Sequence, residues 1–200
     1  MTAAGREPRT CPAVPWRIGG RNRRSLRPAH ACYGYRVGEP PQWTFNGEKH
    51  LMTDAFPAVA AAIKQVLEGQ GFTKLVGAEV VSIEPGVVVM ALDRRPEVLQ
   101  QNGLFHGGVI AYLIDNATTA AAGTVIDRAR RTVITAEYKI NLVSPSIGDR
   151  LTCRAEVVKP GRSLTVVDAK VFCRVDGADK LVAVALATIA NLDRKPGNEA

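Results

Sequence analysis

One long stretch without proline, residues 106–124, is rich in Ala and predicts a single long helix. Four segments typical of strands follow it, near 132–142, 151–159, 164–175 and 180–192. They are separated by SPSIGD, KPGRS and DGADK, which are clusters of turn-forming residues. This order of one long helix and then four mostly antiparallel strands leaves few folds open to the chain.

The part of the chain before this helix carries shorter signals. Residues 55–67 place apolar side chains at helical spacing and end before two glycines, which predicts a short amphipathic helix. Two runs rich in β-branched residues, 75–83 and 87–92, flank a Glu-Pro-Gly turn and predict a hairpin. Residues 96–103 predict a loop.

Alternation in the first of the four later strands defines the two faces of the predicted sheet. Its apolar row consists of Ile134, Ala136, Tyr138, Ile140 and Leu142, with polar residues between them. A sheet with one apolar face must be covered, and the long helix is the segment apolar enough to cover it. The prediction is an α+β domain in which an antiparallel sheet wraps around one long central helix, the arrangement called a hotdog fold.

The positive charge is concentrated near the beginning of the chain. Residues 1–51 contain nine Lys or Arg and three acidic residues, whereas the whole chain has a net charge of +7, so the remaining residues carry about +1. We interpret residues 1–51 as a disordered basic extension or the product of a wrongly assigned start codon, in preference to a transit peptide or a nucleic-acid-binding arm. The folded domain is expected at 52–193, followed by a tail at 194–200.

Composition also bounds the cellular setting and the cofactors. No segment approaches the roughly 20 consecutive apolar residues that span a bilayer, and the first residues lack the apolar core of a secretory signal. The four cysteines are spaced too widely for a CxxC metal motif. We therefore expect a cytoplasmic protein with no metal, no cofactor, no membrane contact and no nucleic-acid partner.

The segment QQNGLFHGGVIAYLIDN, from Gln100 to Asn116, contains the candidate catalytic residues. Gly107 and Gly108 open the predicted helix, where two glycines are costly unless the backbone must approach another group closely. The N–H groups of the first turn have no partners within the helix, and the helix dipole is positive at that end. Both glycines are therefore candidate donors to a carbonyl oxygen that becomes an oxyanion.

Asp115 lies about two turns further along the same helix, in line with Gly108, Thr118 and Thr119. A carboxylate that faces small and hydroxyl side chains is a candidate general base or nucleophile, although a single Asp on a helix is often only solvated. Eight residues separate Gly107 from Asp115, about 12 Å along a helix, which is too far for both to act on one reacting centre. We infer a two-fold dimer with antiparallel long helices, in which Gly107 of one chain meets Asp115 of the other.

The sequence HGG, six further residues and then Asp115-Asn116-Ala117 resembles the PaaI-type acyl-CoA thioesterases of the hotdog superfamily. The stretches TAEYKINLVSPSIGD and VKPGRSLTVVDAKVF are similar to later strands of that family, so the resemblance covers about residues 75–192. It implies that acyl-CoA and water give a carboxylic acid and free CoA. By this resemblance Asp115 activates water or attacks the thioester, and the N–H of Gly107 polarises the carbonyl.

The resemblance also implies roles for two neighbouring groups. Family members commonly have an Asn or Gln six residues before the histidine of HGG, oriented toward the reacting carbonyl or water. This position is Gln100 here, or Asn102 if the loop is shorter. A Ser or Thr on the strand after the helix assists the acid. Thr135 falls at that place, but the alternation puts it off the apolar row, so it can serve only if that face borders the dimer interface.

The other expected site residues surround the substrate. His106 is interpreted as a helix cap rather than a proton-transfer group. Gly108 and Thr119 are expected to line the same site. Arg162 and Ser163, in the KPGRS turn, are implied contacts to the nucleotide part of CoA, where a lone Arg can equally be only solvated. The expected partners are an acyl-CoA substrate and a second copy of the chain, in a homodimer or a homotetramer.

Two other functions remain open from the sequence. A hotdog hydratase or dehydratase would act on the same thioesters, because a fold alone does not fix the chemistry, but such enzymes usually pair a catalytic His with an acid in different motifs. A non-catalytic acyl-CoA sensor with a basic tail would have no need of Asp115. The sequence leaves undecided the acyl group, the choice between dimer and tetramer, and the choice between base and nucleophile.

Overall fold

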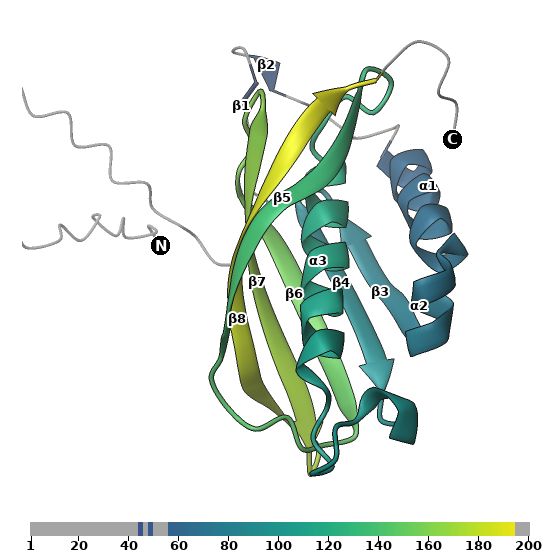
Figure 1. Cartoon of the computed structure of the whole chain (residues 1–200). Helices are drawn as coiled ribbons and strands as arrows, with labels where there is room; N and C mark the ends of the chain where they lie inside the picture. The colour runs from purple at the N-terminus through teal and green to yellow at the C-terminus, as the bar shows by residue number, and fades with distance from the viewer. Residues whose placement is uncertain (1–43, 46–47, 50–55, 195–200) are drawn as a thin grey trace, which may run out of the picture. The chain divides into compact units, whose positions relative to one another are not determined.

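The computed structural model describes residues 44–45, 48–49 and 56–194 (Figure 1). The predicted basic extension 1–51 lies outside the described residues except for two short strands, β1 (Thr44–Phe45) and β2 (Glu48–Lys49), which pair antiparallel. The predicted tail 194–200 also lies outside them, apart from Arg194. The domain expected at 52–193 is described from Phe56 onward.

Six strands form one antiparallel sheet, in the order β3-β4-β6-β7-β8-β5. Their bounds are β3 (Ala78–Glu84), β4 (Val87–Asp93), β5 (Arg131–Leu142), β6 (Arg150–Lys159), β7 (Leu164–Val175) and β8 (Ala178–Asp193). The four strands predicted after the long helix are all present, with ends within two residues of those expected. Strand β5 lies at one edge of the sheet and pairs with β8, the last strand of the chain.

Helix α3 (Gly107–Gly123) packs against one face of this sheet and contacts all six strands (Figure 1). A short 3-10 turn, η1 (Pro96–Val98), lies in the predicted loop before it. Burying a Leu or Ile side chain contributes roughly 1.5–3 kcal/mol, so the contact between α3 and the sheet contributes strongly to stability. The fully buried side chains of this core include Leu113, Ile114, Met90, Leu151 and Val171. The arrangement confirms the predicted α+β hotdog fold.

Two helices precede the sheet, where one was expected. Helix α1 (Phe56–Gly69) matches the predicted amphipathic helix. Residues Gly71–Val76 form a second helix, α2, so the prediction of a strand beginning at Leu75 is wrong. Gly77 ends α2 with a φ of 69°, in the left-handed region that favours glycine, and the guanidinium of Arg95 donates to the carbonyl of Leu75 there.

An extra residue interrupts the alternation of β5. Thr135 pairs with Ile189 and Glu137 pairs with Thr188, so Ala136 is a β-bulge without a partner of its own on β8. Ile189 is fully buried in the core beneath α3. Because paired residues share a face, Thr135 also faces α3.

The bulge corrects the predicted apolar row. Ile134 lies on the outer face of the sheet and is 54% exposed, so the prediction that it joins the core is wrong. After the bulge the prediction is right, since Tyr138 and Ile140 pair with the buried residues Ala187 and Ala185. One inserted residue moves every following side chain to the opposite face of a strand.

Two further properties of the described residues concern membranes and metals. No helix among them combines the length and apolar composition needed to cross a membrane. Within the same ranges, no group of three or more His, Cys, Asp or Glu side chains is arranged to hold a metal ion.

Candidate active site

His106 caps the N-terminus of α3. Its Nδ1 atom accepts a hydrogen bond of 2.9 Å from the N–H of Gly108. A β-carbon at Gly108 would lie 3.0 Å from that Nδ1 atom, so any larger residue would crowd the cap. The capping role predicted for His106 is therefore present, and it engages the N–H of Gly108.

Gly107 provides the remaining backbone donor at this helix end. Its N–H forms no hydrogen bond with any residue in the described part of the chain. The positive end of the helix dipole also points toward an acceptor placed here. Of the two donors expected from the sequence, Gly107 is the one available to an oxyanion.

Gln100 lies in the loop that leads to this helix. Its Oε1 atom accepts a hydrogen bond of 2.8 Å from the N–H of Asn102, which leaves its NH₂ group as the free end of the amide. Gln100 lines the pocket beside Gly107, whereas Asn102 is exposed and does not. Of the two alternatives for this position, the structure places Gln100 near Gly107.

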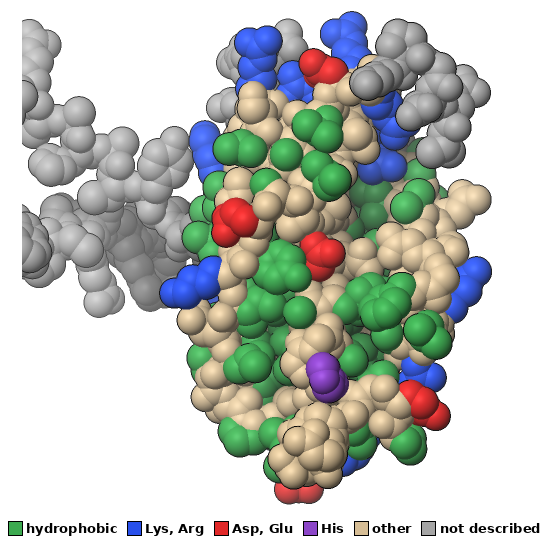
Figure 2. Space-filling model, in the orientation of Figure 1, with side chains coloured by type: hydrophobic (Ala, Val, Ile, Leu, Met, Phe, Trp, Pro, Cys, Tyr) green, Lys and Arg blue, Asp and Glu red, His purple; other side chains and the backbone are tan. Residues whose placement is uncertain are grey.

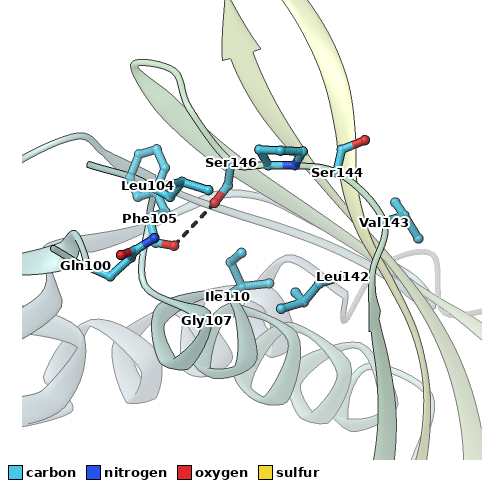
Figure 3. Close-up of a pocket in the computed structure, with 10 residues that line it drawn as sticks. Gln100, Leu104, Phe105, Gly107, Ile110, Leu142, Val143, Ser144 and Ser146 are labelled. Atoms are coloured by element: carbon cyan, nitrogen blue, oxygen red, sulfur yellow. Dashed lines mark hydrogen bonds between the residues drawn. The ribbon is translucent and has the colours of Figure 1, made fainter. Parts of the chain in front are cut away.

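A pocket of about 420 Å³ adjoins the start of α3 (Figure 3). Its lining is made by Gln100, Leu104, Phe105, Gly107, Ile110 and Leu142, together with residues 143–146. Ser146 joins the last of these segments to the loop before α3, because its carbonyl accepts from the N–H of Phe105 at 3.1 Å and its hydroxyl donates to the Phe105 carbonyl at 3.3 Å. The walls are therefore fixed by hydrogen bonds, and the surface inside is mostly apolar.

Asp115 is half-buried on α3 and is held by hydroxyl groups of α3 and β5. The hydroxyl of Thr135 donates to Oδ1 of Asp115 at 2.6 Å, and the hydroxyls of Thr119 and Thr135 lie 2.7 Å apart. A carboxylate only accepts hydrogen bonds, so the proton of Thr135 is committed to Asp115 and Thr119 must donate to Thr135. No described residue donates to Oδ2 of Asp115, which leaves this oxygen available to a water or a substrate.

The position of Thr135 follows from the bulge at Ala136. In the predicted alternation Thr135 faced away from the helix, but the structure turns it toward Asp115. Thr118, which was expected on the same line as Asp115, is instead fully buried and donates to the carbonyl of Ile114 at 2.8 Å. The hydroxyls beside the carboxylate are therefore those of Thr119 and Thr135.

The pocket and the carboxylate are separate within one chain. Asp115 does not line the pocket, and eight residues of continuous helix lie between Gly107 and Asp115. That length is about 12 Å along the axis. The described chain alone therefore does not bring the two together.

A polar cluster joins α2 to the exposed side of α3, and sequence analysis missed it. The hydroxyls of Tyr112 and Thr73 lie 2.6 Å apart, and Oε1 of Gln70 accepts from Thr73 at 3.1 Å and from Asn116 at 3.2 Å. The rings of Tyr112 and Phe72 meet edge to face with centroids 5.0 Å apart. Sequence analysis could have brought Thr73 and Tyr112 together only if it had predicted that residues 71–76 form a helix.

The predicted nucleotide contacts, Arg162 and Ser163, lie outside the pocket beside Gly107. Arg162 and Ser163 are exposed in the turn between β6 and β7 and do not line the pocket. The turn is fixed by its backbone, because the carbonyl of Ser163 accepts from the N–H of Asn191 at 2.8 Å and that of Arg162 accepts from the guanidinium of Arg131. The side chain of Arg162 extends from an anchored loop.

Comparison with known proteins places the chain among thioesterases. The family model described as the thioesterase superfamily matches residues 102–179, which include Gly107, Asp115 and Thr135. A 1,4-dihydroxy-2-naphthoyl-CoA hydrolase of Listeria monocytogenes is 30% identical over 120 residues, covering 60% of this chain and 94% of that protein. Acyl-coenzyme A thioesterase 13 of Homo sapiens is 26% identical over 134 residues, covering 66% and 93%.

Solved structures give the same picture. A thioesterase family protein from Silicibacter pomeroyi has a TM-score of 0.65 and 30% identity, and the match covers 70% of this chain and 99% of that one. A thioesterase from Haemophilus influenzae has a TM-score of 0.61 over 70% of this chain and 94% of its own, but at 18% identity this second likeness concerns the fold alone.

Proposed function

The chain belongs to the thioesterase superfamily and is a thioester hydrolase, and from this we propose that it hydrolyses acyl-CoA at composite sites between two subunits. The observation that carries the proposal is the pair of groups on one helix. The available N–H of Gly107 stands at the start of α3, and the carboxylate of Asp115, held by Thr135, stands eight residues later.

The two groups suit the two parts of thioester hydrolysis. Asp115 takes a proton from water, and the resulting hydroxide attacks the thioester carbon, or the carboxylate itself attacks and forms an anhydride that water then opens. In either route the carbonyl oxygen becomes an oxyanion, which accepts a hydrogen bond from the N–H of Gly107. The carbon–sulfur bond then breaks, and the sulfur leaves as a thiolate that is protonated to the free thiol.

Strand β5 supports the dimer in this proposal. It lies at the edge of the sheet and is 12 residues long, and in the described part of the chain no strand pairs with its outer edge. A long open edge is a surface on which another strand can pair. Tyr138 and Leu142 of β5 are 37% and 61% exposed. Apolar side chains spread over the face of the domain that carries α3 (Figure 2). A second copy packed there with its α3 antiparallel would bring Gly107 of each chain toward Asp115 of the other.

The names of two relatives support CoA as the thiol carrier. The protein from Listeria monocytogenes is named for a naphthoyl-CoA, and the human protein is named an acyl-coenzyme A thioesterase. The exposed side chain of Arg162 fits the same substrate, because a guanidinium suits phosphate groups of the kind that CoA carries.

Thiol release tests this function directly. Purified protein is mixed with phenylacetyl-, benzoyl-, hexanoyl- and palmitoyl-CoA, and the free thiol is followed with a thiol-reactive dye. We expect turnover of at least one of these substrates by the wild type. In the Asp115→Asn variant, which keeps the shape of the side chain but lacks the base, we expect a loss of about 100- to 10,000-fold.

A matched control separates the loss of a base from the loss of a charge. Asp168→Asn removes a carboxylate from the outer face of β7, where it is paired with Lys170 at 3.8 Å, and should leave turnover unchanged. If the wild type binds acyl-CoA but releases no thiol from any of the four, the proposal fails in favour of a hydratase or a sensor. Equal turnover by wild type and Asp115→Asn would remove Asp115 from the mechanism.

A further inference from the structure

The pocket beside Gly107 combines polar groups with a larger apolar surface. The N–H of Gly107, the amide of Gln100 and the hydroxyl of Ser144 are among its polar groups, while Phe105, Ile110 and Leu142 form much of the apolar surface (Figure 3). Phe105 and Ile110 are both 2% exposed and belong to the core. They are therefore rigid walls rather than side chains that can move aside.

Leu142 differs from these walls, because it is 61% exposed although it lies on the helix-facing side of the sheet. It pairs with the fully buried Ala183, so it points the same way as that residue. The neighbouring residue of α3 is Gly107, and Cδ1 of Leu142 lies 3.8 Å from the place where a β-carbon of Gly107 would be. Gly107 has no side chain to cover this leucine, which also lies at the end of the edge strand.

This position puts an apolar side chain next to the predicted oxyanion donor. Gly107 and Leu142 both line the pocket, so an acyl group whose carbonyl accepts a hydrogen bond from the N–H of Gly107 would share the pocket with Leu142. A mostly apolar pocket with a few convergent donors is the usual form of a small-molecule site. The acyl group is the apolar part of the substrate that such a wall would receive.

We propose that this pocket receives the acyl group and that Leu142 selects it, favouring compact acyl groups such as an aromatic ring over long straight chains. The inference rests on the proposed thioesterase function and names the part of the substrate that this pocket recognises. The volume of about 420 Å³ lies within the range for ligand pockets, and the buried side chains of Phe105 and Ile110 limit the pocket on the core side. An acyl group bound in this pocket would cover part of the exposed surface of Leu142.

Substitutions that change the size of this side chain test the inference. The kcat/KM values for acetyl-, hexanoyl-, benzoyl- and palmitoyl-CoA are measured for wild type, Leu142→Ala and Leu142→Phe. We expect Leu142→Ala to lower kcat/KM for benzoyl-CoA about tenfold and to change that for acetyl-CoA less than threefold, because one or a few methylene contacts are worth about that factor. Leu142→Phe should exclude the benzoyl ring, with at least a tenfold loss, and spare acetyl-CoA.

Leu186→Ala is the matched control. Leu186 is 52% exposed on β8, where it pairs with Lys139 on the outer face of the sheet, and its truncation should leave all four values unchanged. Size-exclusion chromatography of each variant separates a change of selectivity from a loss of subunit contact, since Leu142 also lies on the edge strand.

The outcomes distinguish this inference from the proposed function. If the wild type hydrolyses these thioesters but both Leu142 variants change all four values by one common factor, the function stands and the selectivity role is wrong. The same holds if wild type prefers palmitoyl-CoA over benzoyl-CoA, because the pocket is then not a compact acyl site. If no thioester is hydrolysed at all, both the function and this inference fall.

Discussion

The hydroxyl of Thr135 donates a hydrogen bond of 2.6 Å to Oδ1 of Asp115, across the interface between β5 and α3. The hydroxyl of Thr119, one turn further along α3, lies next to the hydroxyl of Thr135 and extends this series of hydrogen bonds. Because each hydroxyl has one proton, the order of donation is fixed once the carboxylate accepts. The orientation of Asp115 thus depends on two residues that never need to touch the substrate.

Replacing Thr135 with Val keeps the shape of the side chain but removes its proton. A hydrogen bond to a charged group contributes about 1.5–3 kcal/mol, so we expect kcat/KM to fall about 10- to 100-fold. Thr135→Ser should keep most of the activity, because it retains the hydroxyl. Steady-state kinetics with the preferred acyl-CoA provide the measurement.

Thr119 supplies the control for this chain of hydroxyls. If it acts through Thr135, the double variant Thr119→Val/Thr135→Val should be no slower than Thr135→Val alone, since coupled residues do not add. Fully additive losses would show that Thr119 acts independently, for example by contacting the substrate.

Gly107 allows its N–H to be removed without breaking the helix. It is the first residue of α3, a position where proline is accepted, and His106 before it is already extended, with ψ 136°. We expect Gly107→Pro to lower kcat about 100- to 1,000-fold through loss of the oxyanion donor. Gly107→Ala keeps the N–H, and its methyl group would meet only Leu142 at 3.8 Å, so it should remain within tenfold of wild type.

The composite site predicts that two inactive variants restore each other. In a heterodimer of Gly107→Pro and Asp115→Asn, one site contains both substitutions and the other contains neither. Co-expressed chains that pair at random should therefore show about a quarter of the wild-type activity, since half the dimers are mixed and each has one intact site. Heterodimers isolated with two different affinity tags and still inactive would place both residues in one chain's site.

The bulge in β5 predicts opposite effects at two adjacent residues. Ile134 is on the outer face, so Ile134→Thr should change the free energy of unfolding by less than about 0.5 kcal/mol. Val133 packs against the core, so Val133→Thr should destabilise by roughly 1–2 kcal/mol, because it buries a hydroxyl there. Urea unfolding checks the pair, and a larger loss at Ile134 would contradict the bulge.

Cys153 makes stability depend on alkaline pH. Burial raises the pKa of its thiol from an ordinary value of 9.0 to about 12. The unfolded chain releases this proton near pH 9 while the folded chain keeps it, so the folded state binds more protons between about pH 9 and 12 and the free energy of unfolding falls as pH rises. The decline should approach about 1.4 kcal/mol per pH unit.

The variant Cys153→Ala isolates that thiol from other groups that titrate at high pH. The free energy of unfolding is measured in urea at pH 8, 9, 10 and 11 for both proteins. Their difference should shrink steadily above pH 9, and a constant difference would mean that Cys153 is accessible to solvent in the native protein.

Sequence analysis predicted the long helix and the later strands because those signals are local. The absence of proline from α3 and the turn residues between strands are readable without tertiary context. Helix α2 was missed, since the apolar run 75–83 suits a strand on both sides of Gly77, and the contacts of residues 71–76 with Tyr112 are not visible in the local sequence. The bulge at Ala136 left no mark in an alternation that looks unbroken.

Sequence analysis likewise predicted the residues of the candidate site that have local signals and missed those that depend on tertiary contacts. HGG and Asp115 could be found from their spacing, and the cap formed by His106 followed from its place before two glycines. The place of Leu142 in the pocket could not be predicted, because it depends on tertiary contacts. Leu142 lies beside Gly107 and lines the pocket together with residues 143–146. Gly107 and Leu142 are 35 residues apart in the sequence, and a contact over that distance leaves no local sequence pattern.

The bulge at Ala136 also determines that Thr135 and Leu142 face the same side of the sheet. Thr135 and Leu142 are separated by seven positions, an odd number, and in an uninterrupted strand two such residues point in opposite directions. The inserted alanine changes the parity, so that both side chains point toward α3. Strand β5 can thereby hold the carboxylate of Asp115 through Thr135 and contact the acyl group through Leu142. Deleting Ala136 would leave the composition almost unchanged. Thr135 and Leu142 would then point to opposite faces of the sheet, so only one of them could face α3.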